Sequence, residues 1–368
     1  MATTTVPQFV ERDPDVIMAE SKTMLETLLG RELQPAQLEQ LMLQFIVYRE
    51  VLLLNRFNAG MSQMLYQFST APILDYLAGL VAVERLPEAQ AGCTVRFTFV
   101  AGHGNILLPE GTRVSTSDSK VIFETIDDLA VAQGTEFVDL PVLAEVSGKS
   151  ANNYAVGTVN KILDPVPFVL EVSNLDVTGG GSDEESDEHL RERIKLAPSQ
   201  YSTAGSRASY LFHAKSANAL ITDVSISSPI PGTVLIVPLT GDDDTPAQVL
   251  SDIYNACNAE DVRPLTDTVI VSAPVIKNYA IAVNVTLYDS ADSTTSQSDI
   301  TAALNEYAQS KRGKLGQDVI KSHIIEACRL GSVYDVSVTS PVSNIVVSES
   351  EYAKCTGITV NITGFNHG

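Results

Sequence analysis

Residues 221–229 read Ile-Thr-Asp-Val-Ser-Ile-Ser-Ser-Pro, and residues 333–341 read Val-Tyr-Asp-Val-Ser-Val-Thr-Ser-Pro. The two stretches align position by position, and each follows a segment with helical periodicity, residues 206–219 and 318–329. Each ends at a Ser-Pro pair, which signals a turn. An internal duplication of a helix followed by a strand is therefore predicted.

Both copies alternate between apolar and polar residues, as expected for a strand with one buried face. The apolar positions are Val224, Ile226, Val336 and Val338, and the polar positions are Asp223, Ser225, Asp335 and Ser337. We expect the polar face to be exposed or to lie at a sheet edge. A second strand is predicted after each turn, at residues 233–237 and 344–348. The C-terminal half is thus predicted to form two tandem α+β modules, residues 179–275 and 276–368.

Upstream of the modules, the period of apolar residues is two. Val95, Phe97 and Phe99 alternate with polar residues, and glycines and prolines then punctuate the sequence. Short strands are predicted at residues 121–123, 137–140 and 156–159. We expect residues 89–178 to form a small β-rich domain, either a sandwich or a barrel.

Three consecutive glycines, residues 179–181, mark a tight turn after this β-rich domain. Ser182 and Glu185 have the spacing of a capping box. In that motif the serine side chain accepts from the backbone amide three residues later, and the glutamate side chain accepts from the backbone amide of the serine. A helix beginning near Ser182 is therefore predicted.

The first 88 residues are predicted to be helical. Asp13-Pro14 is a helix start signal, and Gly30 and Pro35 separate two helices. The second helix has apolar residues at spacings of three and four, typical of a coiled-coil seam, at Leu38, Leu41, Phe45, Tyr48 and Leu52. We predict that these five residues contact a partner chain; the alternative is that the helix is sandwiched within its own domain. Gln44, Arg49 and Glu50 interrupt the segment, which is too short and too polar to span a bilayer.

The chain is strongly acidic. Its 45 acidic and 24 basic residues give a net charge of −21, whereas nucleic-acid binding depends on lysine and arginine neutralising phosphates. Neither nucleic acid nor an anionic membrane is therefore expected as a partner. The N-terminal residues lack the basic and apolar regions of a secretory signal, so we expect synthesis and folding in a cytoplasm.

Candidate catalytic and metal-binding residues are few. The histidines at 103, 189, 213, 323 and 367 are scattered, and the cysteines at 93, 257, 328 and 355 have no ligand spacing, so we expect reduced and mostly buried thiols. His323 is expected to be packed on a helix face. Residues 242–244 are three aspartates that invite a divalent-cation interpretation, but Thr245-Pro246 favours an acidic helix start instead. No nucleophile elbow or phosphate-binding loop occurs, so we predict no catalytic residues, no cofactor, no metal and no enzyme activity.

Several stretches, in order along the chain, resemble the baseplate J-like family. They are Leu-Pro-Glu-Gly-Thr-Arg-Val-Ser-Thr at 108–116 with Phe-Glu-Thr at 123–125, Gly-Lys-Ser-Ala-Asn-Asn-Tyr-Ala-Val-Gly at 148–157, Glu-Ser-Asp-Glu-His-Leu-Arg-Glu-Arg at 185–193 after the Gly179 turn, Thr-Ala-Gly-Ser at 203–206 with Tyr210, and Val224 followed by Pro-Gly-Thr-Val at 231–234.

The resemblance implies a structural wedge subunit of a contractile-tail baseplate, located in the virion and assembled in the host cytoplasm. Such a subunit would form a ring around the central hub and couple baseplate rearrangement to sheath contraction. Implied partners are other wedge and hub proteins, sheath-proximal tail proteins and copies of the chain itself. The alternatives are a receptor-binding or glycan-binding tail protein, which the absence of tryptophan disfavours, and a metal-dependent hydrolase built on the Asp243 cluster.

Overall fold

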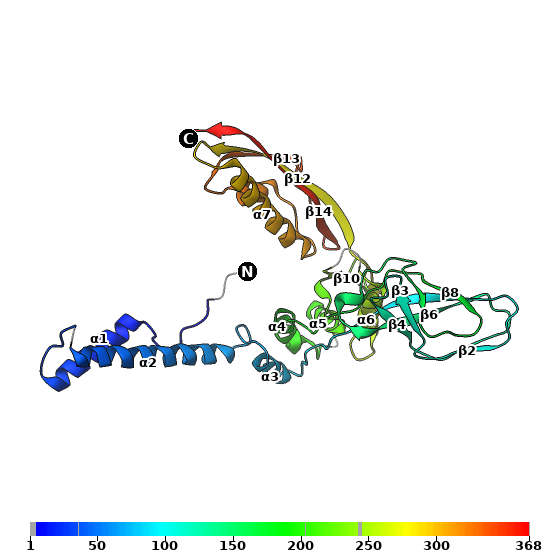
Figure 1. Ribbon diagram of the computed structural model, residues 1–368, viewed down its shortest axis with the longest axis horizontal. Coiled ribbons are helices and arrows are strands. Elements are labelled where there is room, and N and C mark those ends of the chain that lie inside the picture. The colour runs from blue at the N-terminus through cyan, green and yellow to red at the C-terminus, as the bar shows by residue number, and fades with distance from the viewer. Residues whose placement is uncertain (1–4, 36, 203, 242–244, 368) are drawn as a thin grey trace. The chain divides into compact units, whose positions relative to one another are not determined.

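The computed structural model describes residues 5–35, 37–202, 204–241 and 245–367 (Figure 1). The chain divides into two compact units. The first comprises Met1–Arg85 together with Leu190–Lys195, and the second comprises Leu86–His189 together with Leu196–Gly368. Mixed helices and strands confirm the predicted α+β class.

The first unit is helical, as predicted. It contains α1 (Pro14–Leu29), α2 (Leu38–Gln63), α3 (Ile73–Gly79) and the central part of α4 (Asp187–Leu196). The Asp13 carboxylate caps α1 by accepting from the Asp15 amide, and Gly30 ends this helix in the left-handed conformation, with φ of 67°. Both predicted boundary signals of the first helix are therefore confirmed.

The second unit begins with a nearly closed barrel. Its six-stranded sheet has the order β7-β3-β4-β6-β1-β8, and β2 pairs separately with β5. The bounds are β1 (Gln90–Phe99), β2 (Ile106–Leu108), β3 (Arg113–Thr116), β4 (Ile122–Thr125), β5 (Leu129–Val131), β6 (Phe137–Ser147), β7 (Val159–Ile162) and β8 (Val169–Asn174). The two edge strands are β7 and β8. They are joined by a hydrogen bond from the Val159 amide to the Asn174 side-chain oxygen, at 2.8 Å. The strand predicted at 156–159 begins only at Val159.

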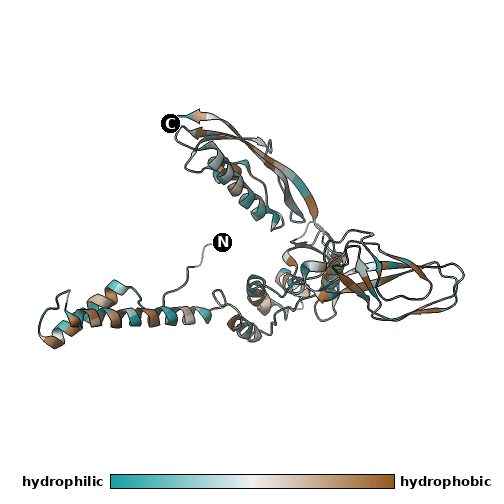
Figure 2. Cartoon of the chain, in the orientation of Figure 1, coloured by the Kyte–Doolittle hydropathy of each residue, from teal (hydrophilic) through white to brown (hydrophobic). Residues whose placement is uncertain are grey.

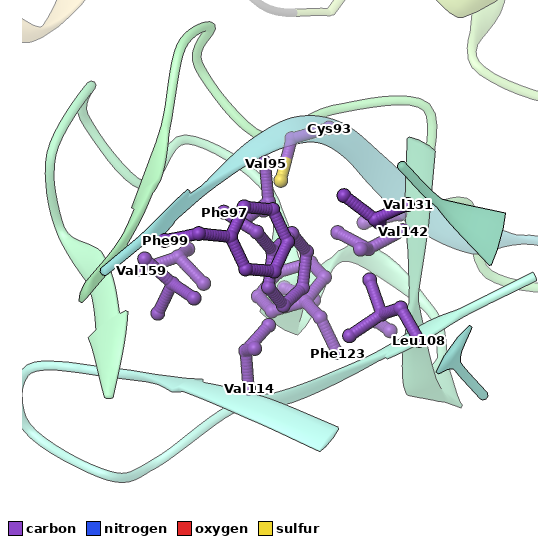
Figure 3. Packing of buried hydrophobic residues seen from close by; sticks show 14 of the residues in the cluster. Cys93, Val95, Phe97, Phe99, Leu108, Val114, Phe123, Val131, Val142 and Val159 are labelled. Atoms are coloured by element: carbon purple, nitrogen blue, oxygen red, sulfur yellow. The ribbon is translucent and has the colours of Figure 1, made fainter. Parts of the chain in front are cut away.

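The barrel core follows from the alternation in β1. Residues Cys93, Val95, Phe97 and Phe99 are all buried, whereas the intervening residues face outward. Phe123, Val114, Val142 and Val159 from neighbouring strands complete the core (Figure 3). The predicted period of two is confirmed.

Residues 179–181 lie where three segments of the second unit approach one another. A Cβ atom at Gly181 would overlap the Gly148 carbonyl oxygen, and one at Gly179 would lie 2.8 Å from the Pro246 Cβ. Gly180 has φ of 87°, a left-handed conformation. Gly181 is therefore required for close backbone approach, Gly179 for the contact with the Pro246 side chain, and Gly180 for its left-handed conformation.

The central module follows. It contains α5 (Arg207–Ala217), β9 (Ile221–Ser227), β10 (Thr233–Thr240), α6 (Ala247–Asn258) and β11 (Thr268–Val271), with the strand order β11-β10-β9. Tyr210, Ile236 and Ile253 lie at the centre of its core. Short 3-10 turns cover Lys149–Ala151 in the barrel and Ala197–Ser199 before this module.

The C-terminal module contains β12 (Val275–Tyr288), α7 (Ser293–Arg312), α8 (Lys321–Cys328), β13 (Val333–Ser340) and β14 (Glu351–Asn366). The strand order is β13-β12-β14. Ile281, Val283, Val285 and Leu287 on alternate positions of β12 are buried against α7 and α8 side chains, including Ile300 and Ile324.

The two copies of the repeat form β9 and β13, which are both edge strands of their sheets. Asp223 and Asp335 each accept a hydrogen bond from the amide of the next residue. The polar face predicted at the sheet edge is therefore confirmed, and it is structural.

The duplication does not extend to strand pairing. β9 pairs antiparallel with the strand that follows it, β10, whereas β13 pairs antiparallel with the strand that precedes it, β12. The strand predicted at 344–348 is wrong: Ile345 makes only an isolated bridge to Val319, and the next strand, β14, starts at Glu351. β12 already pairs with β13 and β14 on its two sides, so no free edge of β12 remains for residues 344–348.

Candidate partner interface

Helices α1 and α2 pack through one line of apolar side chains. Ile17 of α1 and Leu43 and Val47 of α2 are buried in this contact. Met18, Leu25, Val51 and Leu54 pack around them and are partly exposed. The contact uses one side of α2 alone, because these α2 residues recur at spacings of three and four.

Polar contacts hold the connections of this helix pair. The Asn58 side chain accepts from the Phe9 and Val10 amides at 2.8 and 3.1 Å, and it donates to the Val10 carbonyl at 3.0 Å. Arg31, in the loop between the helices, pairs with Glu39 in the first turn of α2 at 2.7 Å. The orientation of α2 relative to α1 is therefore specified at both ends of the contact.

The opposite side of α2 is apolar and exposed. The five predicted interface residues have exposed fractions from 37% for Leu52 to 69% for Leu38. None of the five belongs to the core between α1 and α2. Figure 2 shows apolar residues recurring along α2. The predicted seam is thus a free surface of the first unit, and its contact with a partner chain stays a prediction.

Four further residues widen this surface. Met42, Ile46, Leu53 and Phe57 are between 50% and 59% exposed. The coiled-coil pattern predicted only the five seam residues and did not include these four. Their mutual spacings of four and seven place them on one line of the helix, beside the seam. We call the nine residues, the five predicted and these four, the α2 apolar face.

The α2 apolar face is a large exposed apolar surface. Fully burying one large apolar side chain stabilises a structure by about 1.5–3 kcal/mol. Nine such residues on one helix side form the kind of contiguous patch that marks an interaction site on a folded protein. The α2 apolar face is therefore the candidate interface.

The predicted capping box at Ser182 and Glu185 is wrong. Ser182 forms a backbone bridge with Ala89 instead, and the helix begins at Asp187. The Ser186 side chain accepts from the His189 amide at 3.3 Å, in the position of the cap. Because Ser182 is held in the bridge, it cannot cap a helix.

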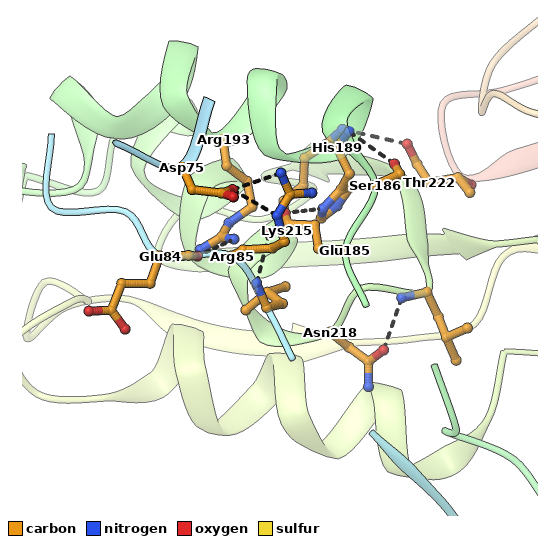
Figure 4. Close-up of polar contacts among 12 residues, drawn as sticks. Asp75, Glu84, Arg85, Glu185, Ser186, His189, Arg193, Lys215, Asn218 and Thr222 are labelled. Atoms are coloured by element: carbon orange, nitrogen blue, oxygen red, sulfur yellow. Dashed lines mark hydrogen bonds and ion pairs between the residues drawn. The ribbon is translucent and has the colours of Figure 1, made fainter. Parts of the chain in front are cut away.

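Glu185 has a different role within the second unit (Figure 4). Its carboxylate is buried, accepts from the Leu86 amide at 2.9 Å, and lies 2.5 Å from His189 Nδ1. Its own amide donates to the Leu86 carbonyl. Glu185 therefore connects the first residue of the second unit to the start of α4.

Within the first unit, the α4 arginines hold the segment that follows α2. Arg193 donates to the Glu84 carbonyl at 3.0 Å, and Arg191 donates to the Ser69 carbonyl at 2.7 Å. Arg85 forms an ion pair with Asp75 at 2.7 Å. Helix α4 thus holds this segment at Ser69 and Glu84, and the Arg85–Asp75 pair lies within the segment itself.

Glu185→Ala is expected to lower the local free energy of unfolding by about 2–4 kcal/mol, because the partly buried Leu86 amide loses its acceptor and His189 Nδ1 loses its partner. Hydrogen exchange of the amides of residues 86–92 measures this loss. Glu185→Gln retains an acceptor and should lose less, and the exposed neighbour variant Glu184→Ala should stay within about 0.5 kcal/mol of the wild type. Equal exchange in Glu185→Ala and Glu184→Ala would contradict the assigned role.

Three domain descriptions of one family match the chain in succession. The baseplate J-like protein barrel domain matches residues 94–181, the baseplate J-like central domain matches residues 202–273, and the baseplate J-like protein C-terminal domain matches residues 279–361. The chain belongs to the baseplate J-like family. The resemblance seen in the sequence is therefore confirmed.

Two individual proteins are similar to this baseplate J-like chain. Baseplate protein J of Escherichia phage P2 is 33% identical over 182 residues, covering 49% of this chain and 60% of the relative. A chain in the cryo-EM structure of the anti-feeding prophage baseplate, six-fold symmetrised, is 14% identical, with a TM-score of 0.39 over 94% of this chain and 92% of that chain.

The thiols of this baseplate J-like chain are all free. Cys93, Cys257 and Cys328 are buried, as predicted, and Cys355 is partly exposed. Burial raises the pKa of Cys93 and Cys257 to about 12 and that of Cys328 to about 11, so these three thiols stay protonated at neutral pH. None of the three is an activated nucleophile.

Metal-binding geometry is also not found among the described residues, where no group of three or more His, Cys, Asp or Glu side chains converges. The aspartates 242–244 lie outside the described residues.

The prediction of a packed His323 is wrong: its side chain is exposed, because Ile324 and Cys328 occupy the buried face of α8. In the part of the chain that the structure describes, no helix has the length and apolarity to cross a membrane.

Proposed function

We propose that this chain is a structural wedge subunit of a contractile-tail baseplate. In this role it forms a ring around the central hub and couples baseplate rearrangement to sheath contraction. Its partners are other wedge and hub proteins, sheath-proximal tail proteins and copies of itself. Membership of the baseplate J-like family supports the assignment, as does the similarity to the phage P2 protein whose name places it in a baseplate.

The observation that carries the proposal is the combination of three baseplate J-like domains with a helix whose outer side is apolar. The α2 apolar face remains uncovered by α1, and permanent assemblies bury about 2,000–5,000 Å² in contacts of apolar character. We assign Leu38, Leu41, Phe45, Tyr48 and Leu52 to the partner contact.

The proposal divides the chain into four parts. These are an assembly region at residues 1–88, a β-rich domain at 89–178, and two α+β modules at 179–275 and 276–368. We assign no catalytic residue, no metal and no cofactor to any part. The net charge of −21 supports neither a nucleic-acid partner nor an anionic membrane partner. The proposed location is the baseplate of the virion, after assembly in the host cytoplasm.

Labelling the native particle tests this location. Val342 is 85% exposed in the turn after β13, so an epitope inserted there should leave the fold intact. Antibody-bound gold in electron micrographs should lie around the end of the tail tube at several positions per particle. Gold only at the tips of fibres would instead support a receptor-binding protein, and gold on no particle would contradict a virion role.

A further inference from the structure

The turn before β8 places a phenylalanine where glycine is usual. Phe168 is the third residue of a four-residue turn that the Val169 amide closes by donating to the Val166 carbonyl at 3.3 Å. Its φ is 68°, and Pro167 precedes it. Proline followed by a residue of positive φ is the pattern of a type II turn, in which glycine or asparagine is preferred at the third position. Local folding therefore does not explain the phenylalanine.

Burial does not explain it either. The Phe168 side chain is 54% exposed and is not part of the barrel core. A bulky residue in the left-handed region is strained, and such strain is concentrated at sites of function. The strained turn thus holds an aromatic ring in solvent.

A second irregularity follows two residues later. The register of β8 against β1 shifts between Thr98 and Phe99, so that Leu170 has no residue opposite it on β1. Such a bulge redirects the side chain of the extra residue. Leu170 is 66% exposed. Two neighbouring departures from regular structure therefore each expose a large apolar side chain.

Strand pairing places further side chains on the same part of the barrel. Thr98 of β1 lies opposite Phe137 of β6 and opposite Glu171 of β8. Directly opposite residues share one face, which here is the outer face because the buried positions of β1 alternate with it. The exposed residue Val100 donates its amide to the Phe168 carbonyl at 2.9 Å. We call Val100, Phe137, Phe168, Leu170 and Glu171 the barrel-end surface.

The barrel-end surface has a free negative charge. The exposed Glu171 carboxylate makes no ion pair or hydrogen bond with any residue that the structure describes. The nearby cation on this face, Arg96, is already bound to Asp139 through two hydrogen bonds of 2.7 and 2.8 Å. Its guanidinium carbon lies 4.0 Å from the centre of the Phe137 ring. This face thus already holds one guanidinium between a ring and a carboxylate, and Glu171 beside exposed apolar side chains is suited to another cation.

A second copy that docked through the same surface would not supply that cation. Each copy would bring its own Glu171 and an Arg96 that is already paired, and each carries a net charge of −21. Like charges brought together in a contact oppose association. The occupant is therefore a different chain.

We propose that the barrel-end surface binds an apolar segment of a different protein that carries an arginine or lysine opposite Glu171. Phe168 is the anchor of this contact, and Pro167 restricts its turn before binding, which lowers the entropic cost of association. The inference rests on the proposed function, because the occupant is taken to be another chain of the baseplate. It adds a second contact surface, in the second unit of the chain.

Phe168→Asn separates binding from folding. Asparagine adopts positive φ more readily than phenylalanine, so the purified variant should melt at a temperature no lower than the wild type. A side chain conserving only the fold would not be strained, and its loss would lower the melting temperature. Clearly earlier melting of Phe168→Asn would therefore show that the ring is structural and would overturn the proposal.

The contact itself is tested by photo-crosslinking in assembled particles. Leu170 is replaced by benzoylphenylalanine in the only source of this chain, and the particles are purified and irradiated. Mass spectrometry should locate the adduct on a different protein, in an apolar stretch that contains arginine or lysine. Phe168→Asn should lower the adduct yield about 10-fold through loss of the anchor, and Glu171→Arg about 5-fold through repulsion.

The matched control is Asp127→Arg, which makes the same charge change at an exposed position between β4 and β5 and should leave the yield within about 2-fold of the wild type. An adduct on a second copy of this chain, an adduct that Phe168→Asn and Glu171→Arg leave unchanged, or no protein adduct would each overturn the proposal. These results leave the proposed function intact if the particles contain this chain. Particles without the chain would instead contradict the proposed function itself.

Discussion

Leu41→Asp/Phe45→Asp is expected to abolish particle assembly while leaving the chain folded. The two side chains are 53% and 65% exposed, so the α1–α2 contact does not need them. Enclosing two carboxylates in an apolar contact without partners costs several kcal/mol, which exceeds what a subunit interface tolerates. Electron microscopy and infectivity of particles made with the variant as the only source of this chain measure the loss.

The matched control for that experiment is Leu265→Asp/Val342→Asp. These side chains are 98% and 85% exposed and lie outside the α2 apolar face, and the variant adds the same two charges. Particles should then form in normal numbers. If the α2 variant also yields normal particles, the α2 apolar face is not an assembly interface; if both variants fail, added charge alone is the cause.

Phe97→Ala is expected to destabilise the barrel by about 3–5 kcal/mol, the cost of removing a fully buried aromatic side chain and leaving a cavity. Phe97 is fully buried on the central part of β1, which pairs with β6 at Val138 and with β8 at Val172. The loss corresponds to about 10²- to 10⁴-fold faster hydrogen exchange of the amides of β1, β6 and β8. The α1–α2 amides of the first unit should keep their wild-type exchange rates.

Phe137→Ala supplies the comparison on the same sheet. Phe137 lies opposite Thr98 on β6, is 46% exposed, and its ring lies 4.0 Å from the Arg96 guanidinium carbon. Removing this exposed cation–π contact should cost only about 0.5–1 kcal/mol. Equal exchange rates in the two variants would show that the alternation in β1 does not define the barrel core.

Several predictions from sequence failed where a residue had two compatible partners. Ser182 and Glu185 have the spacing of a cap, but Ser182 pairs with Ala89 and Glu185 binds the Leu86 amide, both distant in sequence. Residues 344–348 have the composition of a strand, yet β12 is paired on both sides by β13 and β14. His323 lies among apolar residues, but on the outer side of α8. Competition with long-range contacts decided the first two cases, and the burial of Ile324 and Cys328 decided the third.

The sequence by itself determined the class of most segments and the family. Periodicity of two placed Val95, Phe97 and Phe99 inside a β domain, and spacings of three and four marked the helices. The Asp and Ser of the repeat predicted a polar strand face that is exposed or at a sheet edge. These patterns depend on neighbouring residues alone. Only the tertiary structure decided which apolar line of α2 faces α1 and which remains free. Leu43 and Val47 meet Ile17, and Leu41 and Phe45 do not. Both lines have helical spacing, so the choice between them depends on the position of a second helix that no local pattern specifies.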